Sequence, residues 1–463
     1  MDQTVIFDAE LLRRYDTTGP RYTSYPTAVS FHENFTEEDF AAWAKATNED
    51  PIPKPLSLYF HIPFCDTVCF YCACNKIATK DRTKVPPYLL RLKEEMRLMS
   101  GLFDLDRSVE QLHWGGGTPT YLNEEQIRDL MDFTRRHFNL RDDDKGEYSI
   151  EVDPRKINAG TIQLLRSVGF NRISIGVQDF DETVQKAVNR IQPEEETLAI
   201  YEAARDEGFK SANFDLIYGL PQQSVEGFAR TIDRVIEVAP DRIAVFNYAH
   251  LPEMFKPQRR IDANELPSPA DKLKILQQSI DKLVAAGYVY IGMDHFAKPD
   301  DELAVAQRDG TLHRNFQGFS AHAECDLIAM GVSSISKVGD SYCQNAKTLD
   351  DYYRILDTGH LPIARGYVLN SDDVLRRDVI MKLICYGELN IPEIEHEYGI
   401  EFGKYFDREI IDLDALAADG LLERGEDYVR VRPAGRLLVR NIGMVFDKYL
   451  RQRETTRRFS RVI

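Results

Sequence analysis

The sequence predicts an α/β fold: a partial (β/α)6, TIM-like barrel followed by a smaller C-terminal domain that is mostly helical and winged-helix-like. Between residues 56 and 250, six short runs rich in β-branched and aromatic residues alternate with amphipathic helical stretches, a pattern typical of a parallel sheet. Beyond Asp372 this alternation stops, and helices flank a two-stranded wing. A chain of 463 residues, 43% of them hydrophobic, is long enough for both units.

Six strands are expected in the barrel, and the helices between them carry apolar residues at spacings of three and four. The expected strands are Leu56–His61, Gln111–Trp114, Tyr148–Val152, Arg172–Gln178, Asn213–Tyr218 and Arg242–Tyr248. A helix from about Pro267 to Leu283 and one further strand-like run from Tyr288 follow them. Because parallel strands of a barrel end at one rim, we expect the chemistry at their carboxyl ends.

Three segments are expected along the chain. Residues 1–50 form an N-terminal segment, and our hypothesis is that its part around Tyr22 to Tyr25 folds over the barrel mouth. Residues 51–370 form the barrel, and residues 371–463 form the C-terminal domain. The wing is expected to serve as a lid or scaffold rather than as a DNA-binding element, because the chain is acidic.

Charge and hydrophobicity exclude several classes of protein. The net charge of -17 argues against a duplex nucleic acid as the main partner, since phosphate binding needs a basic face. The N-terminus lacks the apolar run of a secretory signal, and the longest apolar runs are too short to span a bilayer. We therefore expect a cytoplasmic protein without a membrane span. We also expect a monomer, because no exposed apolar face recurs outside the predicted core.

Four of the seven cysteines, Cys65, Cys69, Cys72 and Cys74, fall within ten residues directly after the first strand. Such crowding is unsuited to separate disulfides and indicates a metal site. Three thiolates spaced CxxxCxxC can bind three irons of a [4Fe-4S] cluster and leave the fourth iron open. The alternative is a zinc ion bound by all four thiols, although such sites normally combine two separate ligand pairs. The isolated Cys325, Cys343 and Cys385 are expected to be small buried hydrophobic residues.

Further candidates follow the next strands. Three glycines, Gly115 to Gly117, allow backbone to approach a ligand closely, although they could simply make a turn. The alternation of the third strand directs Glu151 into the barrel, where two ribose hydroxyls could satisfy its carboxylate. A salt bridge with Arg155 is the alternative for Glu151.

Polar residues also stand at the ends of the later strands. Gln178 ends the fourth strand, Arg190 follows in the next helix, and Asp215 lies in the fifth strand. Each of them could be an ordinary cap, but together they converge on the rim that carries the cysteines. The sequence therefore predicts one site at that rim.

The CxxxCxxC spacing after the first strand resembles the signature of the radical S-adenosylmethionine superfamily. Within it, the sequence is similar from end to end to the oxygen-independent coproporphyrinogen III oxidases. The stretches that carry this resemblance are RYTSYPTA from Arg21, HIPFC from His61, HWGGGTPTYLN from His113, IEVDPR from Ile150, GVQDF, NFDLIYGLP, VFNYAHLP, GMDHFA, RNFQG and the terminal FSRVI.

The resemblance implies a [4Fe-4S] cluster on Cys65, Cys69 and Cys72, and two molecules of S-adenosylmethionine. It assigns Tyr59 and Cys74 to the catalytic centre, with Cys74 near the cluster but not a ligand. The residues that it assigns to S-adenosylmethionine are Tyr59, Tyr71, Gly116, Gly117, Thr118, Glu151, Gln178, Arg190, Asp215, Ala249 and Ile335. For Tyr59, Tyr71, Ala249 and Ile335 the alternative is ordinary apolar packing.

The implied reaction is the decarboxylation of two propionates of coproporphyrinogen III to vinyl groups, giving protoporphyrinogen IX in haem biosynthesis. Arg21, Arg308 and Arg314 are candidates for the substrate carboxylates, with a solvated surface as the alternative. The resemblance implies a flavodoxin-type electron donor. Two other functions stay open: a haem-carrier relative, which usually lacks the fourth cysteine, and a radical enzyme acting on another tetrapyrrole.

The sequence departs from the family pattern in two places. Ala73 stands where a glycine is usual, and His322 and Cys325 follow Gly318 where other residues are expected. Alanine restricts φ to negative values, so the first change limits the backbone of the cysteine loop. The second change could alter chemistry on the substrate side.

Overall fold

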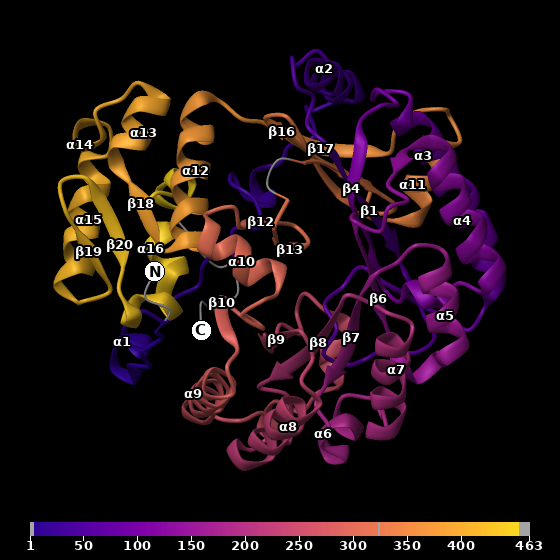
Figure 1. The fold of residues 1–463 in the computed structure, drawn as a ribbon, viewed down its shortest axis with the longest axis horizontal. Helices are drawn as coiled ribbons and strands as arrows, with labels where there is room; N and C mark the ends of the chain where they lie inside the picture. Colours follow the sequence, from indigo (N-terminus) through magenta and orange to yellow (C-terminus); the bar gives the residue numbers. More distant parts are fainter. Residues whose placement is uncertain (1–3, 323–324, 453–463) are drawn as a thin grey trace.

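The computed structural model describes residues 4–322 and 325–452, and one large sheet dominates it (Figure 1). All six expected strands are present and parallel to their neighbours, and they lie side by side in chain order. They are β1 (Leu56–Ile62), β4 (Ser108–Gly116), β6 (Glu147–Val152), β7 (Arg172–Gln178), β8 (Ser211–Tyr218) and β9 (Arg242–Asn247). The predicted partial barrel is confirmed.

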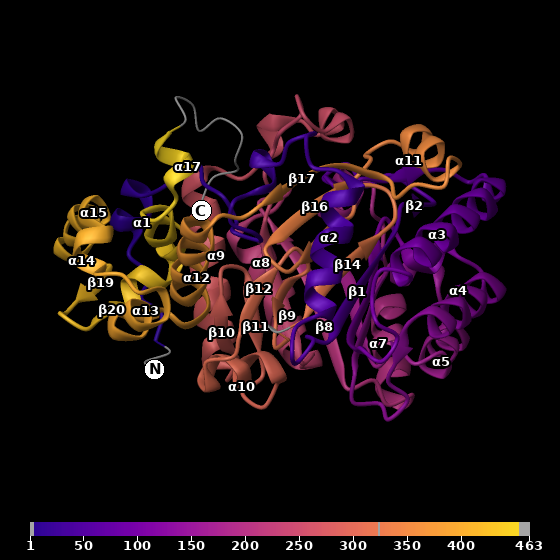
Figure 2. The same cartoon turned by 90° about the horizontal axis from the view of Figure 1, so that it is seen from above.

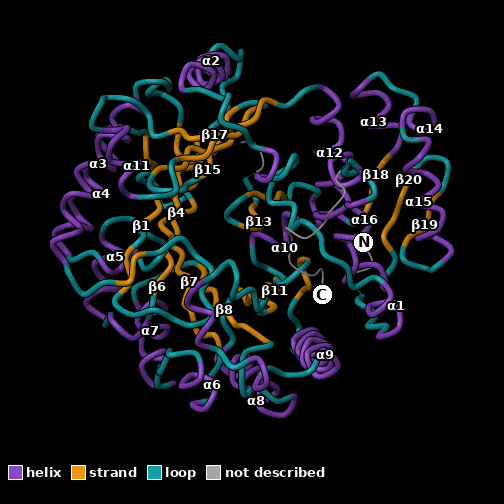
Figure 3. Tube along the Cα trace, turned by 180° about the vertical axis from the view of Figure 1, so that it is seen from behind, coloured by secondary structure: helices purple, strands orange, loops and turns teal. Residues whose placement is uncertain are grey.

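Helices cover the outside of the curved sheet, as Figure 3 shows from behind. They are α3 (Val85–Ser100), α4 (Glu124–His137), α5 (Ala159–Ser167), α6 (Glu182–Ala187), α7 (Glu194–Asp206) and α8 (Val225–Val238). Each amphipathic helix buries its apolar stripe against the strands, as α4 does with Ile127, Leu130 and Met131. The expected helix near Pro267 is α9 (Pro269–Ala285).

Both edges of the sheet were only partly predicted. The single strand expected from Tyr288 is wrong: this segment is a hairpin of β10 (Val289–Gly292) and β11 (His295–Ala297). Gly292 and Met293 have positive φ, so the chain reverses there. Beyond β1 lie β14 (Asp326–Met330), β15 (Ile335–Val338), β16 (Ser341–Asn345) and β17 (Ile363–Val368). The sequence analysis missed all four strands. Three of them, β14, β15 and β16, have only four or five residues, and short runs give weak periodicity.

Smaller elements fill the connections. They are β2 (Phe64–Cys65), β3 (Ile77–Ala78), β5 (Asn139–Leu140), β12 (His313–Asn315), β13 (Gly318–Ser320), α10 (Glu302–Asp309), α11 (Leu349–Leu356) and the 3₁₀ helix η5 (Lys256–Arg260). No helix of the described residues is long and apolar enough to cross a membrane.

The C-terminal domain lies beside the open side of the barrel and has its own core (Figure 1). Its helices are α12 (Ser371–Tyr386), α13 (Ile391–Tyr398), α14 (Phe402–Tyr405), α15 (Asp407–Ala418), α16 (Val439–Met444) and α17 (Lys448–Arg451). The expected two-stranded wing is β19 (Leu422–Arg424) with β20 (Tyr428–Val431), and β18 (Glu388–Asn390) adds a third strand. The terminal FSRVI stretch lies outside the described residues.

The N-terminal segment begins with α1 (Ala9–Arg14) and α2 (Glu37–Asn48), and the chain between them is largely buried between barrel and C-terminal domain. Arg440 Nε donates to the Pro20 carbonyl at 3.0 Å. Tyr22 donates its hydroxyl to Asp447 at 3.0 Å, and its side chain is only 1% exposed. These contacts attach the segment to the C-terminal domain. On its other side Arg21 pairs with Asp294, just before β11, at 2.9 Å, so the segment is wedged between the two domains.

A buried carboxylate ties the sheet to α3. Glu95 is fully buried and accepts hydrogen bonds from the Tyr352 hydroxyl, the Asn345 amide and the Gly331 N–H, at 2.5, 2.5 and 2.8 Å. From the same helix, Tyr88 donates to the His61 carbonyl at 2.5 Å, just before the cysteine loop. Burial raises the pKa of Glu95 to about 7, with the three hydrogen bonds opposing the shift.

We expect this group to make stability depend on pH. Between about pH 4.5 and 7 the folded chain holds a proton at Glu95 that the unfolded chain has released, so the free energy of unfolding falls as pH rises, by up to about 3 kcal/mol. Glu95→Gln removes the titration and should flatten this slope. Urea unfolding of both proteins at pH 5.5 and 7.5 measures how much the free energy of unfolding changes with pH. An equal change in the two proteins would contradict the prediction.

Candidate active site

The carboxyl ends of the barrel strands enclose a cavity of about 270 Å³. Most of the predicted site residues line it, including all four cysteines of the loop. The other predicted residues in its lining are Tyr71, Gly116, Gly117, Thr118, Glu151, Gln178, Arg190 and Asp215. Residues that are far apart in the sequence meet here because parallel strands end at one rim.

The cysteine loop leaves β1 and is held at both ends by backbone hydrogen bonds. The Ile77 N–H donates to the Pro63 carbonyl at 2.7 Å, and the Thr79 N–H donates to the Cys65 carbonyl at 2.9 Å. Cys65 Sγ lies 3.5 Å from the Thr118 hydroxyl. These contacts fix where the loop begins and ends, and the thiols of Cys65, Cys69 and Cys72 face one cavity.

Two arginines lie beside the thiol of Cys69. Arg190 Nη1 is 3.6 Å and Arg155 Nη2 is 3.9 Å from Cys69 Sγ. Asp153 joins the arginines through contacts of 2.5 Å to Arg155 and 3.3 Å to Arg190. Burial would raise the pKa of Asp153, but the charge of Arg190 and the bond from Arg155 lower it to about 2. The site therefore carries positive charge where a thiolate ligand would be negative.

The alternative pairing of Glu151 with Arg155 is wrong, because Arg155 binds Asp153. Glu151 instead accepts a hydrogen bond from the Gly116 N–H at 3.2 Å and lies 3.3 Å from His113 Nε2. Its side chain is 44% exposed and lines the cavity. Carboxylate lone pairs remain for a hydroxyl-bearing ligand.

The glycine run lies against the start of the cysteine loop. The Gly117 N–H donates to the Ile62 carbonyl at 2.8 Å, and a Cβ at Gly117 would lie 2.6 Å from the Pro63 carbonyl oxygen. Gly116 has φ of +119°, a conformation that side chains disfavour. The glycines thus do more than make a turn: they let β4 end in direct contact with the loop that carries the cysteines.

Tyr59, His61 and Asn75 form a hydrogen-bonded chain along the loop. His61 Nε2 lies 2.8 Å from the Asn75 carbonyl, which can only accept, so Nε2 carries the proton. Nδ1 is then the acceptor for the Tyr59 hydroxyl at 3.0 Å. Burial lowers the pKa of His61, which keeps the ring neutral and this tautomer in place. Tyr59 thereby points its hydroxyl at His61.

Asp215 is an unusual carboxylate in the barrel interior. It accepts hydrogen bonds from Ser174 at 2.7 Å and from Asn213 at 2.8 Å. Burial raises its pKa to about 6, although these bonds oppose the shift. No ion pair holds it among the described residues, and its side chain lines the cavity. Such a group is suited to accept hydrogen bonds from a polar or cationic ligand.

Two other predicted residues lie in a neighbouring cavity of about 330 Å³. Tyr59 and Ile335 line it, and Cys74, Gly116 and Glu151 line both cavities. Ala249 lines neither cavity; it follows β9 in a loop. The structure therefore brings every predicted cofactor residue except Ala249 into one connected region.

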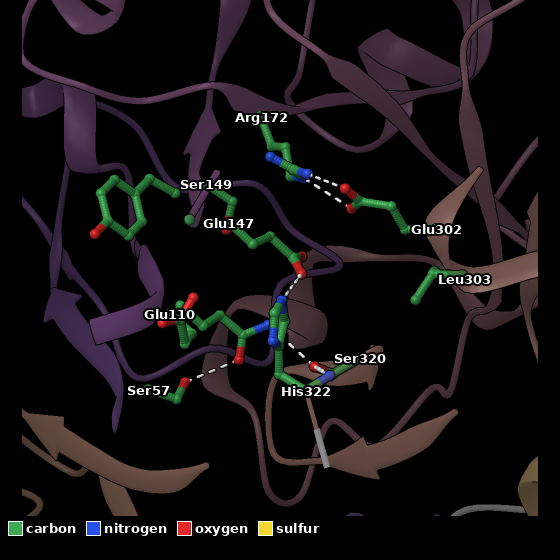
Figure 4. A network of polar contacts seen from close by, with 12 residues as sticks. Ser57, Glu110, Glu147, Ser149, Arg172, Glu302, Leu303, Ser320 and His322 are labelled. Atoms are coloured by element: carbon green, nitrogen blue, oxygen red, sulfur yellow. Dashed lines mark hydrogen bonds and ion pairs between the residues drawn. The ribbon is translucent and has the colours of Figure 1, made fainter. Parts of the chain in front are cut away.

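The second departure from the family pattern, His322 and Cys325, lies at the other end of the barrel from the cysteine loop. His322 Nε2 is 3.5 Å from Glu147 at the first residue of β6, and its N–H binds Ser320 (Figure 4). Arg172, the first residue of β7, pairs with Glu302 beside them. These residues belong to the amino ends of the strands, opposite the cysteines. Cys325 is buried, as are Cys343 and Cys385, which confirms the expectation for the three isolated cysteines.

Sequence reasoning assigned no role to His61 or to Asp153, which is the partner of Arg155. The signal was present, since His61 opens the HIPFC stretch and Asp153 lies in IEVDPR. Hydrogen bonds between loops cannot be read from spacing, so their roles needed the structure.

Comparison with known proteins agrees with this geometry. Residues 59–235 match the radical SAM superfamily model, and residues 369–438 match the HemN C-terminal domain model. The chain is 55% identical to the oxygen-independent coproporphyrinogen III oxidase of Pseudomonas aeruginosa over all of both chains, and 51% identical to that of Escherichia coli over 100% of this chain and 99% of the relative.

A solved structure, described as coproporphyrinogen III oxidase (HemN) from Escherichia coli, a radical SAM enzyme, is 49% identical to this chain. It matches with a TM-score of 0.91 over 96% of this chain and 100% of that one. Identity this high over the full length, on a barrel whose strand ends gather three spaced thiols, shows that the chain belongs to the oxygen-independent coproporphyrinogen III oxidase family of radical SAM enzymes.

Proposed function

We propose that this chain converts coproporphyrinogen III to protoporphyrinogen IX by oxidative decarboxylation of two propionates, using a [4Fe-4S] cluster and two molecules of S-adenosylmethionine. The observation that carries the proposal is the single cavity that Cys65, Cys69 and Cys72 share with Glu151 and Asp215. Three thiols fit a cluster with one open iron, and the carboxylates and glycines around them fit a nucleoside with an amino acid part.

When bound, the cluster and S-adenosylmethionine supply the adenosyl radical that removes a hydrogen atom from the substrate. The chain's own residues bind and orient. Glu151 and Asp215 offer carboxylate oxygens to hydroxyl or amino groups, and Gly116 and Gly117 leave room for backbone contact. Arg190 and Arg155 would balance the negative charge of Cys69 as a thiolate ligand of the cluster. A preorganised, partly enclosed site protects reactive intermediates from water.

Three arginines near the barrel mouth supply positive charge for a tetracarboxylate. Arg21 pairs with Asp294 at 2.9 Å, and Arg314 Nε donates to the Arg21 carbonyl at 3.2 Å. Arg440, which was not among the predicted candidates, lies close enough to interact electrostatically with both. Arg308, by contrast, is exposed and donates to the Pro299 carbonyl.

Arg314 is the best placed of them for a substrate carboxylate. It is 4% exposed, its Nη1 has no hydrogen-bond partner among the described residues, and its guanidinium lies 4.7 Å from the Phe319 ring centre. Phe319 lines the barrel interior together with Glu151 and Asp215. Burial lowers the pKa of Arg314 to about 10, so it remains a cation at neutral pH.

We expect Arg314→Met to raise KM for coproporphyrinogen III by at least about ten-fold, because the variant loses one charged hydrogen bond to the substrate. S-adenosylmethionine cleavage should survive, because Arg314 does not line the cysteine cavity. Arg308→Met is the matched control, since it removes the same charge from an exposed site. Anaerobic kinetics with varied substrate measures both, and an unchanged KM in Arg314→Met would remove it from substrate binding.

The segment around Tyr22 and Tyr25 is proposed to close the barrel mouth over the substrate. The support is its burial between barrel and C-terminal domain and the carbonyl of Arg21 that binds Arg314. We also propose that the protein is a monomer, that it is located in the cytoplasm and that a flavodoxin-type protein donates its electrons.

Anaerobic turnover tests the proposed function. The protein is reconstituted with iron and sulfide and given S-adenosylmethionine, dithionite and coproporphyrinogen III. Formation of both 5'-deoxyadenosine and protoporphyrinogen IX supports it. Deoxyadenosine without decarboxylation would indicate another substrate, and neither product from a cluster-loaded protein would indicate a haem carrier.

A further inference from the structure

The surface around the cysteine loop is basic although the chain is strongly acidic. Three segments meet there: residues 65–84, 153–156 and 253–260. They contain nine basic and four acidic residues, in a chain with a net charge of -17. We call their basic residues the basic rim, and its members are Lys76, Lys80, Arg82, Lys84, Arg155, Lys156, Lys256, Arg259 and Arg260.

Contacts hold the three segments against the loop. Gln258 Nε2 donates to the Tyr71 carbonyl at 3.0 Å, and the Arg260 guanidinium lies 5.4 Å from the Phe70 ring centre. Arg155 reaches Cys69 Sγ, as described above. In Figure 2, β2 and the segment between β9 and α9 both lie in the upper part of the view. Three members of the basic rim, Lys76, Arg155 and Lys156, line the cysteine cavity itself.

Much of this charge is free to meet a partner. Lys80, Lys84, Lys156 and Lys256 are exposed, and none of them has an ion-pair partner among residues 4–322 and 325–452. Met254, two residues before Lys256, is 64% exposed, although methionine is usually buried. An exposed methionine on a segment with basic residues is typical of a protein interface that combines apolar and charged contacts.

We infer that the basic rim is the docking surface for an acidic one-electron carrier protein, the reductant that the proposed function requires. One electron leaves the reduced carrier and arrives at the oxidised cluster, so the carrier must approach the cysteine loop. An acidic carrier is repelled by the overall charge of this chain, and only a local basic surface can attract and orient it. This inference rests on the proposed function for its need of electrons.

Charge reversal on the rim tests the docking. The variants are K256E/R259E and K80E/K84E, which lie in two different segments of the basic rim. The control with the same change in charge is K404E/R408E in the C-terminal domain. Lys404 and Arg408 are exposed and far along the chain from the rim. None of the six residues lines the cysteine cavity. Visible spectra first establish that each protein carries the same amount of cluster.

Two quantities are measured with each holoenzyme: the Kd for a purified flavodoxin by calorimetry, and the rate at which prereduced flavodoxin bleaches the cluster in anaerobic stopped flow. We expect both rim variants to lose at least about ten-fold in affinity and rate at low salt, with the difference shrinking as salt rises. The control should match the unmodified protein. Dithionite, which needs no protein surface, should reduce all four proteins equally.

The inference would be overturned if flavodoxin reduced the cluster of both rim variants at the rate of the unmodified protein. It would also be overturned if the control lost as much affinity and rate as the rim variants. An equal loss with dithionite would also overturn it, because the substitutions would then have damaged the cluster. None of these measurements contains a tetrapyrrole. Failure of the docking surface is thus distinguishable from failure of the proposed decarboxylation, which dithionite-driven turnover tests separately.

Discussion

Cys69→Ala should give a folded protein that cannot hold the cluster and forms no 5'-deoxyadenosine above background. Cys69 is the most buried of the three predicted ligands, and two arginines lie within 3.9 Å of its sulfur. Without the thiolate, a cluster would keep two protein ligands beside two arginines that share the single carboxylate of Asp153. Iron and sulfide content after anaerobic reconstitution, together with deoxyadenosine formation under dithionite, measures the effect.

Cys343→Ala is the matched control for this prediction. Cys343 is also buried, at 1% exposure, but it lies in β16 away from the cavity. We expect it to cost only a modest amount of stability, as for other small core truncations, and to leave cluster content unchanged. A Cys69→Ala protein with a full cluster and full S-adenosylmethionine cleavage would refute the assignment of Cys69 as a ligand.

The second large effect is expected from one methyl group at Gly117. In Gly117→Ala the new Cβ would meet the Pro63 carbonyl at 2.6 Å, and backbone cannot yield as a flexible side chain can. Overpacking of this kind costs about 1–3 kcal/mol, and here it displaces the start of the cysteine loop. We expect the affinity for S-adenosylmethionine to fall by about 10- to 100-fold. Equilibrium binding to the cluster-loaded protein measures it.

Gly403→Ala makes the same chemical change where space is free, since no atom lies within 4 Å of a Cβ built there. It should bind S-adenosylmethionine as the unmodified protein does. Unchanged affinity in Gly117→Ala would show that Pro63 can retreat at little cost, and that the close contact of β4 with the loop is not needed for binding.

Much of the fold could be predicted from the sequence. The six barrel strands were recognisable because each is a buried run of several residues between turn signals, as β7 (Arg172–Gln178) is. The strands beyond β1 were not, because β15 has four residues and takes its place from partners in the sheet. The hairpin at Met293 was hidden because a positive φ at a non-glycine residue has no clear sequence signal.

The site was predictable to the extent that it depends on strand ends. Spacing indicated Cys65, Cys69 and Cys72, and alternation placed Glu151 inside the barrel. What spacing could not give was pairing: whether Arg155 binds Glu151 or Asp153 depends on the path of the loop after β6. Similarly, no local pattern connects Arg440 with Arg21, which come together only when the two domains meet.

The wedged N-terminal segment has a consequence for the order in which the molecule is made. Tyr22 hydrogen-bonds to Asp447, a partner 425 residues later, and the carbonyl of Pro20 accepts a hydrogen bond from Arg440. During synthesis the barrel strands and the cysteine loop emerge long before these partners exist, so the first residues of the chain are among the last to find their place. The contacts that join the first residues of the chain to the C-terminal domain therefore form only when translation is nearly finished.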